Sequence, residues 1–151
     1  MLDDLLGGEN EEPEEAEVAE EDDTPVATLD LLKKKQRVVK TVRVAVSDDA
    51  GNPIRVKLTF QGIPAQQYDK LLSRFPPRPK DKKQGYTYNP DEFGPALISK
   101  TCIEPEMSME DAKEIWESDN WNRGERLNLL MTAIEVCTAG LNVPFKKSAS
   151  G

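Results

Sequence analysis

The sequence predicts an α+β fold, in which an N-terminal β-hairpin packs on a small bundle of three to four helices and a disordered acidic arm precedes both. Three observations lead to this prediction. The first 30 residues are strongly acidic, apolar residues alternate with period two over residues 38–60, and apolar residues then recur at helical spacing. We expect one α+β domain over residues 28–143, with residues 1–27 as the arm and residues 144–151 as a flexible tail.

Charge is divided unevenly along the chain. Residues 1–30 contain 13 acidic residues and no lysine or arginine, whereas the remainder contains 15 acidic and 20 basic residues. The net charge of −8 therefore combines an arm of −13 with a remainder of +5. Such an arm has too few apolar groups to offset the entropy of ordering, so we expect residues 1–27 to be disordered. Its three leucines, Leu2, Leu5 and Leu6, are either incidental or a short docking motif.

The hairpin prediction depends on alternation. Apolar side chains occupy every second position of two segments, which places them on one face of a two-stranded ribbon. The turn between them is Asp48–Asn52, where Gly51 can adopt positive φ. Two strands alone are marginally stable, so the apolar face must rest on helices. That face comprises Val38, Val42, Val44, Val46, Ile54, Val56, Leu58 and Phe60.

Helical spacing predicts four helices after the hairpin, at about residues 64–75, 90–101, 108–118 and 122–139. The segment 76–90 is rich in Pro, Lys and Gly and is predicted as an exposed loop. The expected N-terminal caps are Asn89, Ser108 with Asp111, and Asn120 or Asn122, and a short helical turn before the hairpin is capped by Thr28 or Asp30.

The inner faces of the helices follow from the same spacing. The second helix should bury Phe93, Leu97, Ile98 and Thr101, and it should tolerate Pro95 near its start. The third should bury Ala112, Ile115 and Trp116. The last should bury Leu127, Leu130, Met131, Ile134 and Cys137–Thr138, with Gly140 as its C-terminal cap.

The residue types argue against catalysis and metal binding. The chain has no histidine, no glycine-rich phosphate loop and no CxxC pair, so we expect no enzyme, no cofactor and no metal site. Cys102 and Cys137 are expected to be reduced thiols, with a disulfide as the alternative. Glu104 and Glu106 flank Pro105 and are interpreted as a solvated loop rather than an acid pair.

The chain also lacks signals for membranes or export. No apolar run approaches the roughly 20 residues of a membrane span, and the acidic N-terminus is not a secretory signal. We therefore expect no membrane partner and a location in the cytosol where the protein is made.

Basic residues leave a nucleic-acid interpretation open. Lys33–Arg37 is a basic run, and the later basic loop combines cations with two tyrosines that could hold phosphates and stack bases. The alternative is a solvated linker and loop, and we do not expect nucleic acid as the main partner because +5 is modest and the acidic arm would compete. The loop residues are Arg74, Arg78, Lys80, Lys82, Lys83, Tyr86 and Tyr88.

A series of motifs between Phe60 and Leu141 resembles the tail assembly chaperones of long-tailed bacteriophages, especially those of actinobacterial phages. The motifs are Tyr68-x-x-Leu71, Phe75-Pro76-Pro77, Asn89 through Ile98 with Phe93-Gly94-Pro95-Ala96-Leu97, Ile103-Glu104-Pro105, and Trp116 with Trp121 before the last helix. The sequence departs from the family at Phe75, where many relatives have histidine, and in the basic character of the following loop.

The resemblance implies a dedicated chaperone. Such a protein binds the long, helical tape measure protein, keeps it soluble and helps tail tube subunits to polymerise around it. Family members are commonly made in two lengths by a programmed −1 frameshift, so this chain would correspond to the short form, and contact with the tail tube protein would come through the longer form. The expected location is the host cytoplasm, with the protein absent from the mature virion. Self-association is left open.

The resemblance and the helical spacing together suggest an apolar groove between helices. The expected partner-binding residues are Tyr68, Leu71, Phe75, Phe93, Leu97, Trp116 and Trp121. For the two tryptophans the favoured interpretation is core packing at a helix–helix corner, and the alternative is that one indole is an exposed interface anchor. Met107, Met109 and Met131 are interpreted as gap-filling residues rather than an adaptable binding face.

Two other functions compete with the chaperone. One is a small nucleic-acid-binding or regulatory phage module in which the acidic arm gates the basic loop. The other is a structural protein of the tail.

Overall fold

The computed structural model describes residues 22–139. Contacts divide the chain into two compact units, one ending at Lys35 and one beginning at Gln36, and each is described by itself. The domain predicted from the sequence begins at residue 28, whereas the unit that contains the sheet begins at Gln36. Most of the predicted arm, the predicted tail, the leucine cluster at the N-terminus and Gly140 lie outside the described residues.

The first unit contains one short helix, α1 (Leu29–Lys33). Thr28 caps it, because its hydroxyl oxygen accepts a hydrogen bond from the Leu31 amide at 3.2 Å. An ion pair of 3.0 Å joins Asp30 to Lys34 one turn later. Of the two predicted caps, Thr28 is therefore correct.

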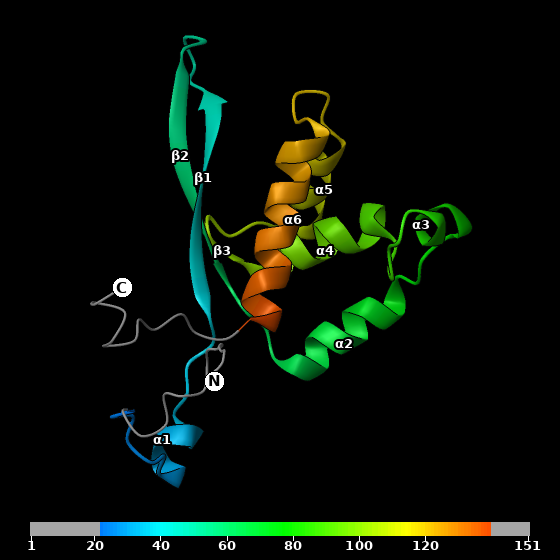
Figure 1. Cartoon of the computed structure of the whole chain (residues 1–151). Coiled ribbons are helices and arrows are strands. Elements are labelled where there is room, and N and C mark those ends of the chain that lie inside the picture. The colour runs from blue at the N-terminus through cyan, green and yellow to red at the C-terminus, as the bar shows by residue number, and fades with distance from the viewer. Residues whose placement is uncertain (1–21, 140–151) are drawn as a thin grey trace, which may run out of the picture. The chain divides into compact units, whose positions relative to one another are not determined.

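The second unit confirms the α+β prediction. A three-stranded antiparallel sheet in the order β1-β2-β3 packs against helices on one side (Figure 1). Its elements in chain order are β1 (Val39–Ser47), β2 (Pro53–Gln61), α2 (Ala65–Arg74), α3 (Pro79–Lys83), α4 (Pro90–Thr101), β3 (Cys102–Glu104), α5 (Met109–Glu117) and α6 (Arg123–Thr138).

The hairpin β1–β2 confirms the predicted strands and turn. The register pairs Val42 with Leu58 and Val44 with Val56, so the alternating apolar residues share one face. In the turn, the Asp48 carboxylate accepts from the amides of Ala50 and Asn52 at 2.9 and 2.8 Å. Within residues 22–139, β1 has β2 on one side and no strand on the other.

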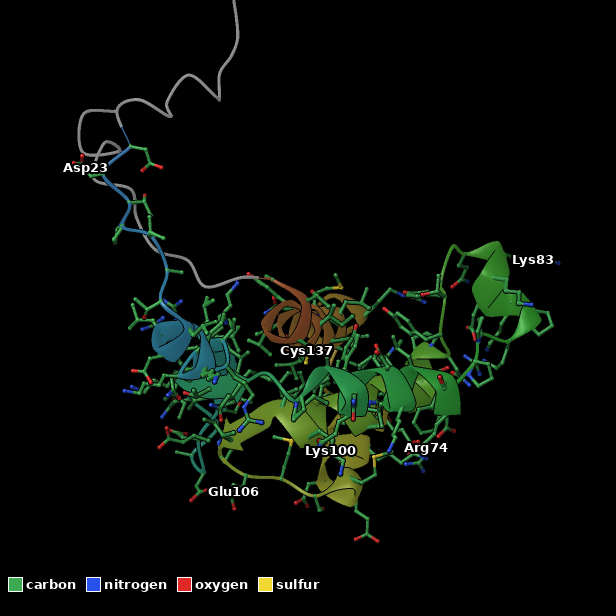
Figure 2. All side chains as sticks on the ribbon, turned by 90° about the horizontal axis from the view of Figure 1, so that it is seen from below. Asp23, Arg74, Lys83, Lys100, Glu106 and Cys137 are labelled. Carbon is green, nitrogen blue, oxygen red and sulfur yellow. The ribbon has the colours of Figure 1, made fainter. Side chains whose placement is uncertain are left out.

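The segment 76–90 corrects one prediction, because it is not simply an exposed loop. It contains α3, and Asp81 in that helix is only 2% exposed. The Asp81 carboxylate accepts from the Arg78 amide at 2.9 Å and from its Nε at 2.8 Å, which closes the first turn after Pro79. Figure 2 shows Lys83 of α3 standing away from the helix that carries Cys137.

The central helix α4 is the most buried element. Asn89 caps it by accepting from the Asp91 amide at 3.1 Å, and the helix continues through Pro95. Phe93, Leu97, Ile98 and Thr101 are all buried, as predicted. The helix packs against α2, α5, α6 and β3. The predicted caps Ser108 of α5 and Asn122 of α6 are also confirmed.

The inner face of α6 was predicted only in part. Leu130 is buried as expected, but Met131 is 54% exposed and Thr138 is also exposed. Helix α6 packs against both the hairpin and α4, and apolar residues occur on most sides of it. Spacing alone therefore could not fix which side faces the core. The residues that are buried are Leu129, Leu130, Thr132, Ala133 and Val136.

Close approach between β2 and α6 depends on Gly62. A Cβ atom at this position would lie 2.3 Å from the carbonyl oxygen of Val136, which belongs to the backbone and cannot rotate away. The close packing of the end of β2 against α6 therefore requires glycine at position 62.

We predict that Gly62→Ala lowers the free energy of unfolding by about 1–3 kcal/mol, because the backbone of β2 or α6 must shift. The measurement is urea denaturation followed by tryptophan fluorescence. Gly124→Ala is the matched control, since its Cβ would lie 3.5 Å from the Asn122 side chain, an ordinary contact. It should leave stability unchanged or raise it by up to about 1 kcal/mol. Equal effects of the two variants would contradict this account of the interface.

Candidate partner-binding surface

The predicted partner-binding residues lie mainly in the hydrophobic core. Phe93 and Leu97 are fully buried, and Trp116 and Leu71 are 5% and 6% exposed. The others, Tyr68, Phe75 and Trp121, are partly buried and pack against the same core. The structure therefore brings the seven residues together as packing between helices. Their role in binding stays a prediction.

Aromatic contacts show how these side chains are used. Tyr68 of α2 meets Phe93 of α4 edge-on, with ring centroids 6.0 Å apart, and Tyr88 lies 4.7 Å from the same ring. Burial raises the pKa of Tyr68 and Tyr88 above the ordinary value, so both hydroxyls stay neutral near pH 7. Tyr88, predicted as a loop aromatic that could stack on bases, is therefore engaged by the core.

Trp116 is also a core residue, as one of its two interpretations predicted. Its Nε1 donates to Asp91 at 3.2 Å, and its ring packs against Gly94, where a Cβ atom would come within 2.7 Å of the indole. The Arg126 guanidinium lies over the ring at 5.2 Å from its centroid. Trp116 belongs to α5, and its side chain packs against residues of α4 and α6.

The exposed apolar surface lies instead on the hairpin. Four residues of β2 point to the same face at alternate positions, and their exposure rises toward the turn. Phe60 is 0% exposed, Leu58 8%, Val56 36% and Ile54 41%. The hairpin extends past the ends of the neighbouring helices (Figure 1). The apolar face of the sheet therefore continues beyond the part that the helices cover.

The partner strand and α6 extend this surface. Val44 and Val46 lie opposite Val56 and Ile54 and are half-buried. Lys40 of β1 forms an ion pair of 2.6 Å with Glu135 of α6, so this side of the helix lies beside the strand. Met131 precedes Glu135 by one helical turn and so lies on the same side of α6. We call this surface, made of Val44, Val46, Ile54, Val56 and Met131, the open face.

The opposite face of the hairpin is polar and basic. Arg43 lies directly across from Lys57, and Arg55 is the diagonal neighbour on β2. Like charges placed opposite each other in a ladder are unfavourable. Thr41 and Thr59 follow, with their hydroxyl oxygens 3.4 Å apart. The hairpin is thus apolar on one face and cationic on the other.

A signal in the sequence could have located the open face. A nine-residue strand spans about 30 Å, whereas a 16-residue helix such as α6 spans about 24 Å. The alternating pattern is therefore longer than the helix that could cover it. The prediction that the whole apolar face rests on helices is therefore wrong at Ile54 and Val56, which are 41% and 36% exposed.

The two cysteines and the two glutamates beside Pro105 were the other candidates for chemistry. Cys102 and Cys137 are free thiols, and burial raises the pKa of each, so neither is a reactive thiolate near neutral pH. Glu104 and Glu106 are exposed on either side of Pro105. Residues 22–139 contain no cluster of three side chains suited to hold a metal ion. No helix in that same range is long and apolar enough to cross a membrane.

Comparison of the chain with protein-family models, with curated proteins and with solved structures found no match.

We predict that the double variant Ile54→Thr/Val56→Thr costs less than about 1 kcal/mol of unfolding free energy, because these side chains are only partly covered. Leu58→Ala, on the same face but under the helices, should cost about 2–4 kcal/mol. Urea denaturation of both variants beside the wild-type chain provides the comparison. A loss in the double variant as large as that of Leu58→Ala would show that the open face is part of the core.

Proposed function

We propose that this protein is a phage tail assembly chaperone that binds the tape measure protein, keeps it soluble and promotes tail tube polymerisation around it. The observation that carries the proposal is the open face, an uncovered apolar surface beside a well-packed core. The motifs between Phe60 and Leu141 add support through their resemblance to this family. The proposed activity is binding alone, with no chemical conversion.

The physical requirement on such a chaperone is a surface that binds apolar helical stripes reversibly. Burying a whole Val, Ile or Met side chain gains about 1.5–3 kcal/mol. The open face offers five partly exposed side chains, so covering it gains on the order of a few kcal/mol before the costs of association. Contact with any one stretch of the client is then weak, which suits a protein that must release its client to the growing tube.

Charge supplies the second requirement, because a chaperone must keep its complex soluble. The chain as a whole carries −8, with 13 acidic residues within the first 30. A client bound at the open face would therefore be held by a highly charged protein.

We predict that the full chain in excess suppresses light scattering by an aggregating tape measure fragment. Ile54→Asp/Val56→Asp should abolish most of this effect, because two carboxylates on the open face oppose burial against an apolar stripe. Arg43→Gln/Lys57→Gln is the matched control, since it changes the same two strands on the opposite face and should retain activity. Unchanged scattering with the wild-type chain would overturn the proposal, and equal activity of the two variants would overturn the assignment of the surface.

The location of the protein gives a separate check. A chaperone acts in the host cytoplasm and leaves before the particle is complete, whereas a structural tail protein stays at fixed stoichiometry. We predict that mass spectrometry detects the protein in infected-cell lysate and not in purified mature particles. Stoichiometric recovery from the particles would favour the structural alternative instead.

A further inference from the structure

A polar cleft lies on the other side of the helical core, where residues of α3, α4, α5 and α6 meet. Its volume is about 250 Å³. The charged side chains that line it are Arg78, Lys80, Asp81, Asp91, Arg123 and Arg126, and Trp116 contributes to its wall. None of these charged residues belongs to the open face, so the cleft is a separate candidate binding site.

Both carboxylates in the cleft are already paired with one arginine. Arg78 donates from Nε and Nη2 to Asp81 at 2.8 and 3.1 Å, and from Nη2 to Asp91 at 2.9 Å. Hydrogen bonds from Arg78 lower the pKa of Asp81 below its ordinary value. At Asp91 burial acts to raise the pKa, but hydrogen bonds from Arg78 and Trp116 outweigh it, so the pKa is lowered there too. Both groups are therefore anionic at neutral pH and balance Arg78.

The other three cations are balanced less closely, since Lys80 acts on Asp81 and Asp91 only through longer-range attraction. Within residues 22–139, Lys80, Arg123 and Arg126 make no ion pair with a carboxylate. Four cations and two carboxylates line the cleft, so its net charge is +2. The carboxylates that line the cleft therefore do not balance its four cations.

Arg126 is positioned by uncharged groups. Its Nη1 donates to the Trp116 carbonyl oxygen at 2.7 Å, and its guanidinium lies over the Trp116 ring. Its Nε is buried and has no hydrogen-bond partner in the part of the chain described. A buried donor of this kind costs stability, and such a feature calls for an explanation. A guanidinium fixed in place without a counter-charge is suited to receive an anion.

We propose that this cleft binds a single phosphate group, free or as a phosphate monoester. A phosphate monoester carries about −1.5 to −2 charges at pH 7, which matches the +2 of the cleft, whereas one carboxylate would leave a positive charge uncompensated. Arginine and lysine donors suit its oxygen atoms. A water occupies about 30 Å³ in the liquid, so the cleft has room for a phosphate with some of its hydration. This proposal does not rest on the chaperone function.

The test uses the full chain with Trp121→Phe, which leaves Trp116 in the cleft as the sole tryptophan. Inorganic phosphate is titrated at constant ionic strength while Trp116 fluorescence and amide NMR shifts are followed. We expect saturable binding, with shifts centred on residues 78–91 and 116–126. Lys80→Gln/Arg123→Gln should weaken it by about tenfold or more, since two charged donors are lost. Both side chains are exposed, so the fold should survive, as circular dichroism will show.

The matched control is Arg43→Gln/Lys57→Gln, which removes the same number of charges from the hairpin and should bind phosphate as the parent chain does. Parallel titrations with a nucleoside monophosphate and with a short oligonucleotide identify the source of the phosphate. Only ligands that bind more weakly to Lys80→Gln/Arg123→Gln occupy the cleft. Among these, the ligand with the highest affinity is the better occupant. The proposal is overturned if phosphate gives only a linear response shared with acetate, if the cleft variant binds as well as the control, or if a glutamate-rich peptide binds there and phosphate does not.

Discussion

The structure depends on the burial of α4 at the centre of the sheet-containing unit. Phe93 and Leu97 are fully buried, and Tyr68, Tyr88 and Trp116 pack around this helix from three different segments. A helix covered on nearly every side can carry few polar groups, and its sequence, with Gly94, Pro95 and Ala96 in succession, is correspondingly small and apolar. The small residues allow close approach, and the aromatic residues of the neighbouring elements fill the remaining space. Helices α2, α5 and α6 all pack against α4.

This central packing separates two surfaces of different chemistry. On one side the hairpin extends past α6 and leaves apolar side chains partly uncovered. On the other side, the contacts of Arg78 with Asp81 and Asp91 hold α3 against the start of α4, and the remaining cations line a cleft. Trp116 connects the core to the cleft, because its ring packs against Gly94 while its Nε1 donates a hydrogen bond to Asp91. A protein of this size thus presents an apolar and a cationic surface from one shared core.

Signals between residues close in sequence predicted the positions of the helices and strands well, but predicted which of their faces are buried less well. Alternation located the hairpin, and the side chains of Asn89, Ser108 and Asn122 located three helix starts, because these depend on residues close in sequence. The buried side of α6 and the extent of cover over Ile54 depend on what packs against them, which spacing alone does not encode. Helix α3 was missed because its stability comes from Arg78 bonding to Asp81, within a segment whose composition is typical of a loop. The predicted groove residues were chosen for being aromatic and apolar, and those same properties placed most of them in the interior.

Among residues 22–139, β1 pairs with β2 alone, and the side that has no strand beside it has a consequence for how crowded molecules behave. An exposed strand edge with an apolar face is a template on which another strand can add, and proteins commonly guard such edges with charge. Here Arg43 sits in the edge strand itself, and Lys57 and Arg55 beside it make that stretch strongly positive. The mutual repulsion that weakens each hairpin internally also acts between two hairpins brought together. The cationic side chains of the hairpin therefore oppose the addition of a second copy along the edge of β1.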